Sequence, residues 1–225
     1  RKNMIKLRNM LIAVIAITAL SSTAFAGSFG VGFGGHAASV SVDGTEAGHG
    51  GGQKSATGGN DAMFGSYFFE YNFGDSERFT LGADFIPGSF DINRKTLKRT
   101  DPASGDANDT AGDRSANATI SDHVTYYADL VIGAGVYVKA GFAQVDIETK
   151  EASTGSGTTG SYPNKTLDAW TFGLGQKGDF GSRGFYKVEG YITDYNQFEA
   201  ASTTGNTVTA NLDVVGASFK LGMKF

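Results

Sequence analysis

The chain contains no cysteine and only three prolines among its 225 residues. Without cysteine it forms neither disulfide bonds nor thiolate metal sites. Beyond its first residues it also lacks a continuous apolar run of about 20 residues, the length that a helix needs to cross a bilayer. Any passage of this later part through a membrane must then use strands, and only a closed barrel gives every backbone polar group a partner there.

Basic residues are too few to balance the acidic ones, with 19 Lys and Arg against 23 Asp and Glu. A net charge of −4 is unfavourable for binding a phosphate backbone, so we expect no nucleic-acid partner. Glycine and phenylalanine are abundant instead, at 33 and 17 residues. This combination is unusual for a soluble core, but it suits strands that face lipid on one side and a packed lumen on the other.

Residues 1–26 have the pattern of a secretory signal peptide, which predicts export through the Sec pathway. The apolar run is too short for a membrane anchor. The rest of the chain, residues 27–225, is predicted to form one domain. The parts of the predicted signal peptide are a start at Met4, a basic stretch with Lys6 and Arg8, an apolar run over 10–20 and an A-x-A cleavage site at 24–26.

The last stretch, residues 217–225, alternates between two kinds of side chain. This period of two predicts a β-strand between two different environments. An apolar strand end without a polar tail fits the wall of a membrane barrel, where lipid contacts one face and the lumen the other. The apolar row is Ala217, Phe219, Leu221, Met223 and Phe225, and the other row is Ser218, Lys220, Gly222 and Lys224.

Seven further segments alternate in the same way, and long and short connections follow each other along the chain, as in bacterial barrels. We therefore predict an all-β fold, an eight-stranded antiparallel up-and-down transmembrane β-barrel, with a bulge after Gly35. The predicted strands are 28–42, 62–73, 78–87, 120–131, 136–143, 167–175, 185–196 and 217–225. The expected loops include the polar or Gly-rich stretches 43–60, 91–118, 148–164 and 198–207.

A soluble eight-stranded carrier is the alternative fold, because alternation alone does not distinguish inside from outside. Three features favour the membrane barrel. Glycines gather on the polar face, aromatic side chains gather at strand ends on the apolar face, and the last residue is Phe225. The aromatic strand ends are typical of the girdles that lie at the two membrane interfaces.

Four features together form a pattern that is typical of a known family. They are the signal peptide, the terminal phenylalanine, and the stretches 136–142 (VYVKAGF) and 188–195 (VEGYITDY). The chain over 27–225 resembles the small outer-membrane β-barrel proteins of Gram-negative bacteria, the porin-family, OmpA-like and opacity-protein-like group. The resemblance implies a location in the cell outer membrane, among its lipid and lipopolysaccharide. It does not include a C-terminal peptidoglycan-binding domain. It also implies that the barrel-assembly machinery reads a signal made of Phe219, Leu221, Met223 and Phe225.

Charged residues on the polar rows are predicted to point into the lumen. An eight-stranded barrel is just wide enough for side chains to fill, and an unpaired buried charge is costly. Four acids and three bases are close to balance, which favours ion pairs that plug the lumen; a narrow ion path through the same residues is the alternative. The predicted network is Glu70, Asp84, Asp129, Lys139, Lys187, Glu189 and Lys220.

A basic run follows the third predicted strand and should lie just beyond the outer membrane interface. Its members are predicted to contact lipopolysaccharide, because Arg and Lys pair well with phosphate; a solvated loop end is the alternative. The nearby acids lack the spacing of a calcium-binding loop, so we predict no metal and no cofactor. The basic residues are Arg94, Lys95, Lys98 and Arg99.

Catalysis has one weak indication, since Ser121 and His123 would share a face of their strand. The lipid-hydrolysing barrels have a His-x-Ser pair, and here Val124 and Thr125 follow the histidine, so we predict no enzyme. The predicted function is that of a monomeric outer-membrane barrel with a structural, envelope-integrity and surface-loop-presenting role. The alternatives are a small passive pore, which would conduct ions, and a lipid-acting enzyme, which would alter lipid A.

Overall fold

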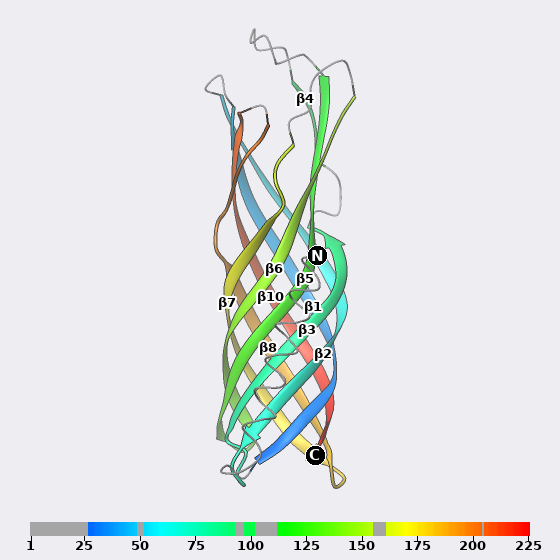
Figure 1. Cartoon of the computed structure of the whole chain (residues 1–225), viewed down its shortest axis with the longest axis vertical. Helices are drawn as coiled ribbons and strands as arrows, with labels where there is room; N and C mark the ends of the chain where they lie inside the picture. The colour runs from blue at the N-terminus through cyan, green and yellow to red at the C-terminus, as the bar shows by residue number, and fades with distance from the viewer. Residues whose placement is uncertain (1–26, 49–51, 93–96, 102–111, 155–160, 204) are drawn as a thin grey trace.

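The computed structural model describes residues 27–48, 52–92, 97–101, 112–154, 161–203 and 205–225; the predicted signal peptide lies outside this part of the chain. Figure 1 shows a tall barrel of tilted strands, with the C-terminus at its lower end and β4 at its upper end. The strands of the described residues are β1 (Gly27–Ala47), β2 (Gln53–Phe73), β3 (Phe79–Asp91), β4 (Leu97–Asp101), β5 (Gly112–Gly133), β6 (Val136–Thr154), β7 (Lys165–Phe180), β8 (Gly184–Tyr195), β9 (Phe198–Ala201) and β10 (Thr207–Lys224).

Eight of these strands close into a ring in the order β1-β2-β3-β5-β6-β7-β8-β10, because β10 returns to pair with β1. All of the pairings are antiparallel. At the lower end Phe29 and Phe225 exchange two backbone hydrogen bonds, of 3.1 and 2.8 Å, which complete the seam. β4 and β9 lie off the ring and pair with β5 and β10. The predicted all-β barrel of eight antiparallel strands is confirmed.

The strands are longer than the sequence predicts, and much of the expected loops is strand. The β1–β2 ladder continues to the pair Ala47 and Gln53, and the β5–β6 ladder to the pair Asp113 and Thr154. β10 begins at Thr207, well before the predicted start of the last strand, and β9 lies inside the predicted loop 198–207. Upper β1, β2, β5 and β6 are rich in Gly, Ser and Thr and lack the outward apolar row that identified the lower segments. In β9 and upper β10 the apolar row lies on the inward face instead, as with Phe198 and Leu212.

The irregularities of the barrel lie in other places than the sequence predicts. β1 keeps one register with both β2 and β10, so the predicted bulge after Gly35 is wrong. The β3–β5 ladder shifts between Ile86 and Ser89, at Pro87 and Gly88, and the β5–β6 ladder shifts after Ser121. Proline has no N–H to donate and this glycine has φ +93°, so neither residue suits a regular ladder.

The lower end of the barrel is closed by short turns. Ala134 and Gly135 alone connect β5 to β6, and both have positive φ, at 47° and 78°. Positive φ at both central residues defines a type I′ turn, whose twist matches that of the two strands. This turn joins the lower ends of β5 and β6 directly, and the β5–β6 ladder shifts once more beside it, between Val131 and Gly133.

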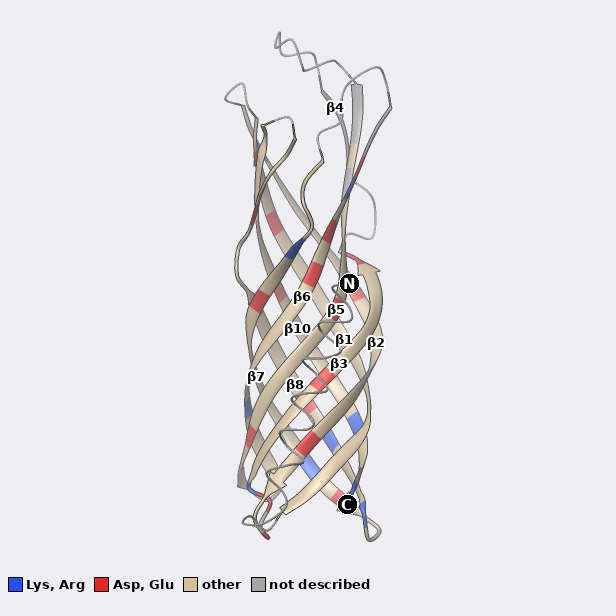
Figure 2. Ribbon diagram, viewed as in Figure 1, with Lys and Arg blue, Asp and Glu red and all other residues tan. Residues whose placement is uncertain are grey.

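The two faces of the lower barrel wall are inverted relative to a soluble barrel. Figure 2 shows that charged residues occupy only scattered positions on an otherwise uncharged wall. The outward row is apolar and largely exposed, whereas the inward row buries the charges. An apolar belt of this size is unfavourable in water and favourable in a bilayer. Outward members of the belt include Phe33, Met63, Trp170, Phe172, Leu174, Ile192, Val215, Phe219 and Leu221.

The inverted faces, together with the closed ring, define the class of membrane-spanning β-barrels and not that of soluble carriers. The described part of the chain contains no helix with the length and hydropathy of a membrane span.

Candidate functional site

The lower lumen contains a layer of buried charges contributed by six strands. The structure places all seven residues of the predicted network there, each at most 6% exposed. Alternation explains the placement, because these residues share the inward parity of their strands. The layer consists of Glu70 on β2, Asp84 on β3, Asp129 on β5, Lys139 on β6, Lys187 and Glu189 on β8, and Lys220 on β10.

Each lysine of this layer is paired with at least one carboxylate. Lys187 lies between two of them, with its Nζ 2.9 Å from Glu70 Oε2 and 2.5 Å from Asp129 Oδ2. The Nζ of Lys139 is 2.5 Å from Glu189 Oε2. Lys220 forms an ion pair with Asp84. Removing one partner of such a pair leaves an uncompensated buried charge, which is strongly destabilising. Each charged side chain of the layer therefore depends on its partner.

Tyr127 lies among the three lysines. The distances from its ring centroid to the Nζ atoms of Lys139, Lys187 and Lys220 are 4.3, 5.0 and 5.4 Å. Its hydroxyl donates a hydrogen bond of 2.9 Å to Glu70 Oε2. A desolvated ammonium over an aromatic ring adds a cation–π attraction to the ion pairs. The sequence interpretation missed Tyr127, although its parity with Asp129 was a usable signal.

Small residues on the lumen face make room for the aromatic rings. A Cβ added to Gly82 would lie 2.4 Å from the Tyr127 ring, and one added to Gly222 would lie 2.4 Å from the Phe185 ring. Phe185 and Phe68 are buried and contact each other edge-to-face, with ring centroids 5.9 Å apart. The charged layer is therefore also filled by packed rings, not only by ion pairs.

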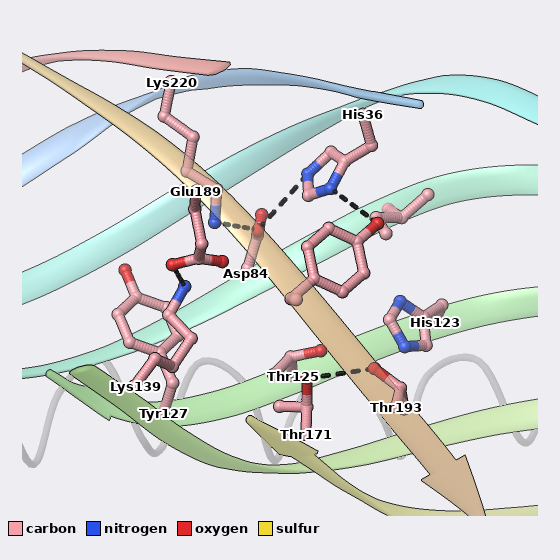
Figure 3. Close-up of a pocket in the computed structure, with 12 residues that line it drawn as sticks. His36, Asp84, His123, Thr125, Tyr127, Lys139, Thr171, Glu189, Thr193 and Lys220 are labelled. Atoms are coloured by element: carbon pink, nitrogen blue, oxygen red, sulfur yellow. Dashed lines mark hydrogen bonds and ion pairs between the residues drawn. The ribbon is translucent and has the colours of Figure 1, made fainter. Parts of the chain in front are cut away.

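A small cavity of about 30 Å³ adjoins the charged layer on its upper side (Figure 3). This volume has room for one or two water molecules. Figure 3 shows Lys220 and His36 approaching Asp84 from two sides. Within the described residues, the buried atoms Asp84 Oδ1 and His123 Nε2 have no hydrogen-bond partner. The cavity is polar enough for water and too small for a larger solute.

His36 is buried in the lumen and was not part of the predicted network. Its Nε2 is 3.0 Å from Ser66 Oγ and 3.5 Å from Asp84 Oδ2, and its Nδ1 is 3.3 Å from the Tyr191 hydroxyl. A catalytic relay needs the serine and the aspartate on opposite ring nitrogens. Here both approach the same nitrogen, so the three residues do not have the geometry of a hydrolase triad.

A ladder irregularity lies between Ser121 and His123, so the predicted shared face of these two residues does not follow from their spacing. The β5–β6 register shifts between Ser121 and Val124, and Asp122 has φ 52°, so simple alternation does not hold across this segment. His123 lines the cavity and lies near Tyr195, with ring centroids 6.4 Å apart. No described residue bonds to His123 Nε2, which leaves this nitrogen without a nucleophile.

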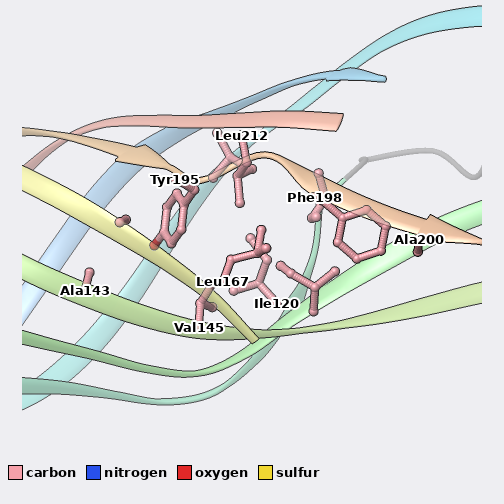
Figure 4. Packing of buried hydrophobic residues seen from close by; sticks show 12 residues of the cluster. Ile120, Ala143, Val145, Leu167, Tyr195, Phe198, Ala200 and Leu212 are labelled. Carbon is pink, nitrogen blue, oxygen red and sulfur yellow. The ribbon is translucent and has the colours of Figure 1, made fainter. Parts of the chain in front are cut away.

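Above the cavity the inward face becomes apolar (Figure 4). The change follows the strands: on β8 the inward row runs from Glu189 through Tyr191 and Thr193 to Tyr195. The sequence interpretation expected a charged lumen and did not predict this second layer. The cluster consists of Val40, Ile92, Ile120, Ala143, Val145, Ile147, Leu167, Ala169, Tyr195, Phe198, Ala200 and Leu212.

The lower rim carries its own ion pairs. Lys224 lies between Glu77 and Asp179, with Nζ to carboxylate distances of 2.5 and 2.8 Å. Ser28 Oγ donates a hydrogen bond of 2.6 Å to Glu77 Oε1. These contacts connect the first and last strands to the β2–β3 turn and to the lower end of β7.

The outward row of β10 and the basic run complete the predicted sites. Phe219, Leu221, Met223 and Phe225 all face outward, with 46–67% of each side chain exposed. Arg94 and Lys95 lie outside the described residues. Lys98 and Arg99 belong to β4 and pair with Ser115 and Arg114 in the β5 ladder. Lipopolysaccharide contact by this run stays a prediction.

No protein-family model matches the chain, and no curated protein matches its sequence. Solved barrels are similar in fold at low identity. The outer membrane protein OprG from Pseudomonas aeruginosa is 13% identical with a TM-score of 0.49, over 89% of this chain and 97% of that one. The outer membrane protease OmpT from Escherichia coli is 8% identical with a TM-score of 0.46, over 91% and 99%.

A third structure, the outer membrane protein AlkL in lipid bilayers, is 16% identical with a TM-score of 0.41, over 91% of this chain and 93% of that one. All three bear names of outer-membrane proteins, the group that the sequence resembles. The assignment of this chain to the membrane-spanning β-barrels rests on its own closed ring of strands, its apolar outer face and its buried inward charges.

Proposed function

We propose that the chain is a monomeric barrel of the Gram-negative outer membrane whose lumen is closed and whose role is structural. It contributes to envelope integrity and presents its upper strands at the cell surface. The observation that carries this proposal is the interlocked charged layer, in which Lys187 joins Glu70 and Asp129 across the lumen. No enzymatic step is part of the proposed function.

The geometry favours this role over that of a passive pore. An ion crossing the layer would have to separate ion pairs whose side chains are almost fully buried. It would also have to pass the buried rings of Tyr127 and Tyr137. Breaking a buried pair costs about 3–5 kcal/mol. The adjoining cavity, at about 30 Å³, accommodates water but no hydrated ion. The apolar cluster above it adds a second barrier.

Single-channel recording in planar lipid bilayers tests the proposal. We expect no regular openings from the purified full-length barrel. The heat-modifiable folded band of the reconstituted protein is the control for insertion, so that a silent bilayer reports a closed barrel and not an absent one. Reproducible unitary openings by the unaltered protein would reject the closed lumen and establish the passive pore instead.

The proposed location includes contacts with lipopolysaccharide through Arg94, Lys95, Lys98 and Arg99. Changing these four residues to Gln should weaken binding of the barrel to lipid A, because phosphate loses its cationic partners. Unchanged affinity for lipid A would remove this contact from the proposal. Mass spectrometry of lipid A before and after exposure to the barrel tests the absence of enzymatic activity.

A further inference from the structure

The two edges of β2 are paired to very different extents. On one edge the ladder with β1 extends over the whole strand, from Phe73 up to Gln53. On the other edge the ladder with β3 ends at Tyr67, which pairs with Phe85. The upper part of β2 therefore has only one strand partner among the described residues.

The lower part of this seam is bridged by side chains in place of backbone bonds. Phe64 of β2 stacks on Phe90 of β3, with ring centroids 6.0 Å apart and planes at 20°. Higher up, Asn60 Nδ2 donates a hydrogen bond of 3.0 Å to the carbonyl of Asp91. Above Asn60, residues 53–59 of β2 have no neighbouring strand on this edge within the described chain.

The directions of the backbone groups on this edge follow from the barrel seam. Phe29 exchanges its hydrogen bonds with Phe225, so the odd-numbered residues of β1 point their N–H and C=O toward β10. Its even-numbered residues then bond to β2, where Val42 pairs with Gly58. By the same alternation the odd-numbered residues of β2 point to the other edge. The unpartnered edge therefore presents N–H and C=O groups of Gln53, Ser55, Thr57 and Gly59.

The edge lies beyond the apolar belt. Met63 is the last outward apolar residue of β2, at 87% exposed, and the next outward residue is Asp61. Residues 53–57 and Gly59 are exposed. The segment contains no proline, no bulge and mostly small side chains, so it lacks several devices with which proteins protect sheet edges.

We propose that residues 53–59 of β2 are a docking edge for an extended polypeptide segment of a partner outside the cell, which adds to the sheet as a further strand. A row of alternating N–H and C=O groups is complementary to another extended backbone and to little else. Small side chains admit many sequences, so main-chain bonds supply most of the affinity. This inference rests on the proposed location in the outer membrane, goes beyond the structural role, and holds whether or not the lumen conducts.

Proline substitutions test whether the edge is unpaired. Thr57→Pro removes an N–H that points to the edge, whereas Ala56→Pro removes one that bonds to β1. We expect Thr57→Pro, like Thr57→Val, to leave amide exchange in upper β1 and β2 unchanged, and Ala56→Pro to accelerate it by about tenfold or more. Equal acceleration by Thr57→Pro and Ala56→Pro would show that the edge is already paired and would overturn the proposal.

A peptide probe then tests docking in lipid nanodiscs. The probe has the sequence of residues 39–47, a segment that already pairs with β2 on its other edge. We expect it to slow amide exchange at Ser55, Thr57 and Gly59 by about tenfold at saturation, with smaller effects at the even-numbered residues between them. A version N-methylated at alternate residues should not protect these amides, and Thr57→Pro should abolish protection by the unmodified probe. Absence of protection, or protection that survives either control, would reject main-chain docking.

Discussion

Lys187 shows how single residues hold the charged layer. It is 1% exposed and is the only described cation within ion-pair distance of Glu70 and Asp129. Lys187→Met leaves both carboxylates buried without it, so we expect the free energy of unfolding to fall by about 3–5 kcal/mol. Denaturant titration in detergent micelles measures this change.

Lys150→Met is the control for the same substitution at an exposed ion pair. Its Nζ is 3.4 Å from Asp91 Oδ1, and both side chains are about half exposed. Exposed pairs contribute less than about 1 kcal/mol, so this variant should unfold almost as the parent does. Equal destabilisation by the two variants would contradict the role assigned to the buried layer.

Tyr127 separates the contribution of a hydrogen bond from that of a ring. Tyr127→Phe removes only the bond to Glu70 and should cost about 1–3 kcal/mol, because a charged acceptor loses a buried donor. Tyr127→Ala also removes the ring and should cost about 3–5 kcal/mol through the cavity left behind. Unfolding measurements on both variants check the order; a Phe variant as unstable as the Ala variant would show that packing contributes little.

At the scale of the strand, β10 is fixed at its lower end by backbone and side chain together. Deleting Phe225 removes two hydrogen bonds to Phe29 and an outward ring that is 67% exposed. We expect the deletion to reduce the folded barrel recovered from the outer membrane several-fold, whereas Phe225→Tyr, which keeps both features, should assemble normally. Quantifying the heat-modifiable folded band measures the yield. Full recovery of the truncated barrel would argue against an assembly signal at this residue.

The strands also show which part of the structure a sequence can predict. Where a strand has lipid on one side and the lumen on the other, the two environments impose two rows, and parity places residues such as Lys139 and Lys220 inside. Where a strand such as upper β2 meets water on its outer face, no alternation is imposed, and residues 53–61 resemble a loop. The same reasoning explains why the predicted strand start at 62 lies near the limit of the apolar belt. Above residue 217 the alternation continues, but the apolar row changes to the inward face, as with Val208 and Leu212.

Ion-pair partners were beyond sequence reasoning for a different reason. Lys187 and Glu70 are 117 positions apart and meet only because the ring closes with a particular stagger between strands. Parity gives the side of the wall, but not the height at which two inward residues face each other. The apolar layer above the cavity was missed on the same ground, since Val40, Val145 and Leu212 lie far apart in the sequence.

For the whole molecule, the lumen consists of three levels that differ in what they exclude. Ion pairs and rings fill the lower level, a polar cavity follows, and apolar side chains fill the upper level. Charged solutes are disfavoured by the apolar level and apolar solutes by the charged level. A closed lumen is therefore expected even if one level is altered without loss of volume.

This expectation distinguishes closure by shape from closure by charge. A triple variant, Lys187→Met with Glu70→Gln and Asp129→Asn, removes the central charges and keeps nearly the same volume. Replacing a complete buried ion network by uncharged groups is often close to neutral, so the triple variant should recover most of the stability lost by Lys187→Met alone. In planar bilayers it should stay silent, because the rings of Tyr127 and Phe185 still fill the lumen. Sustained conductance by the triple variant would show that the charges themselves close the barrel.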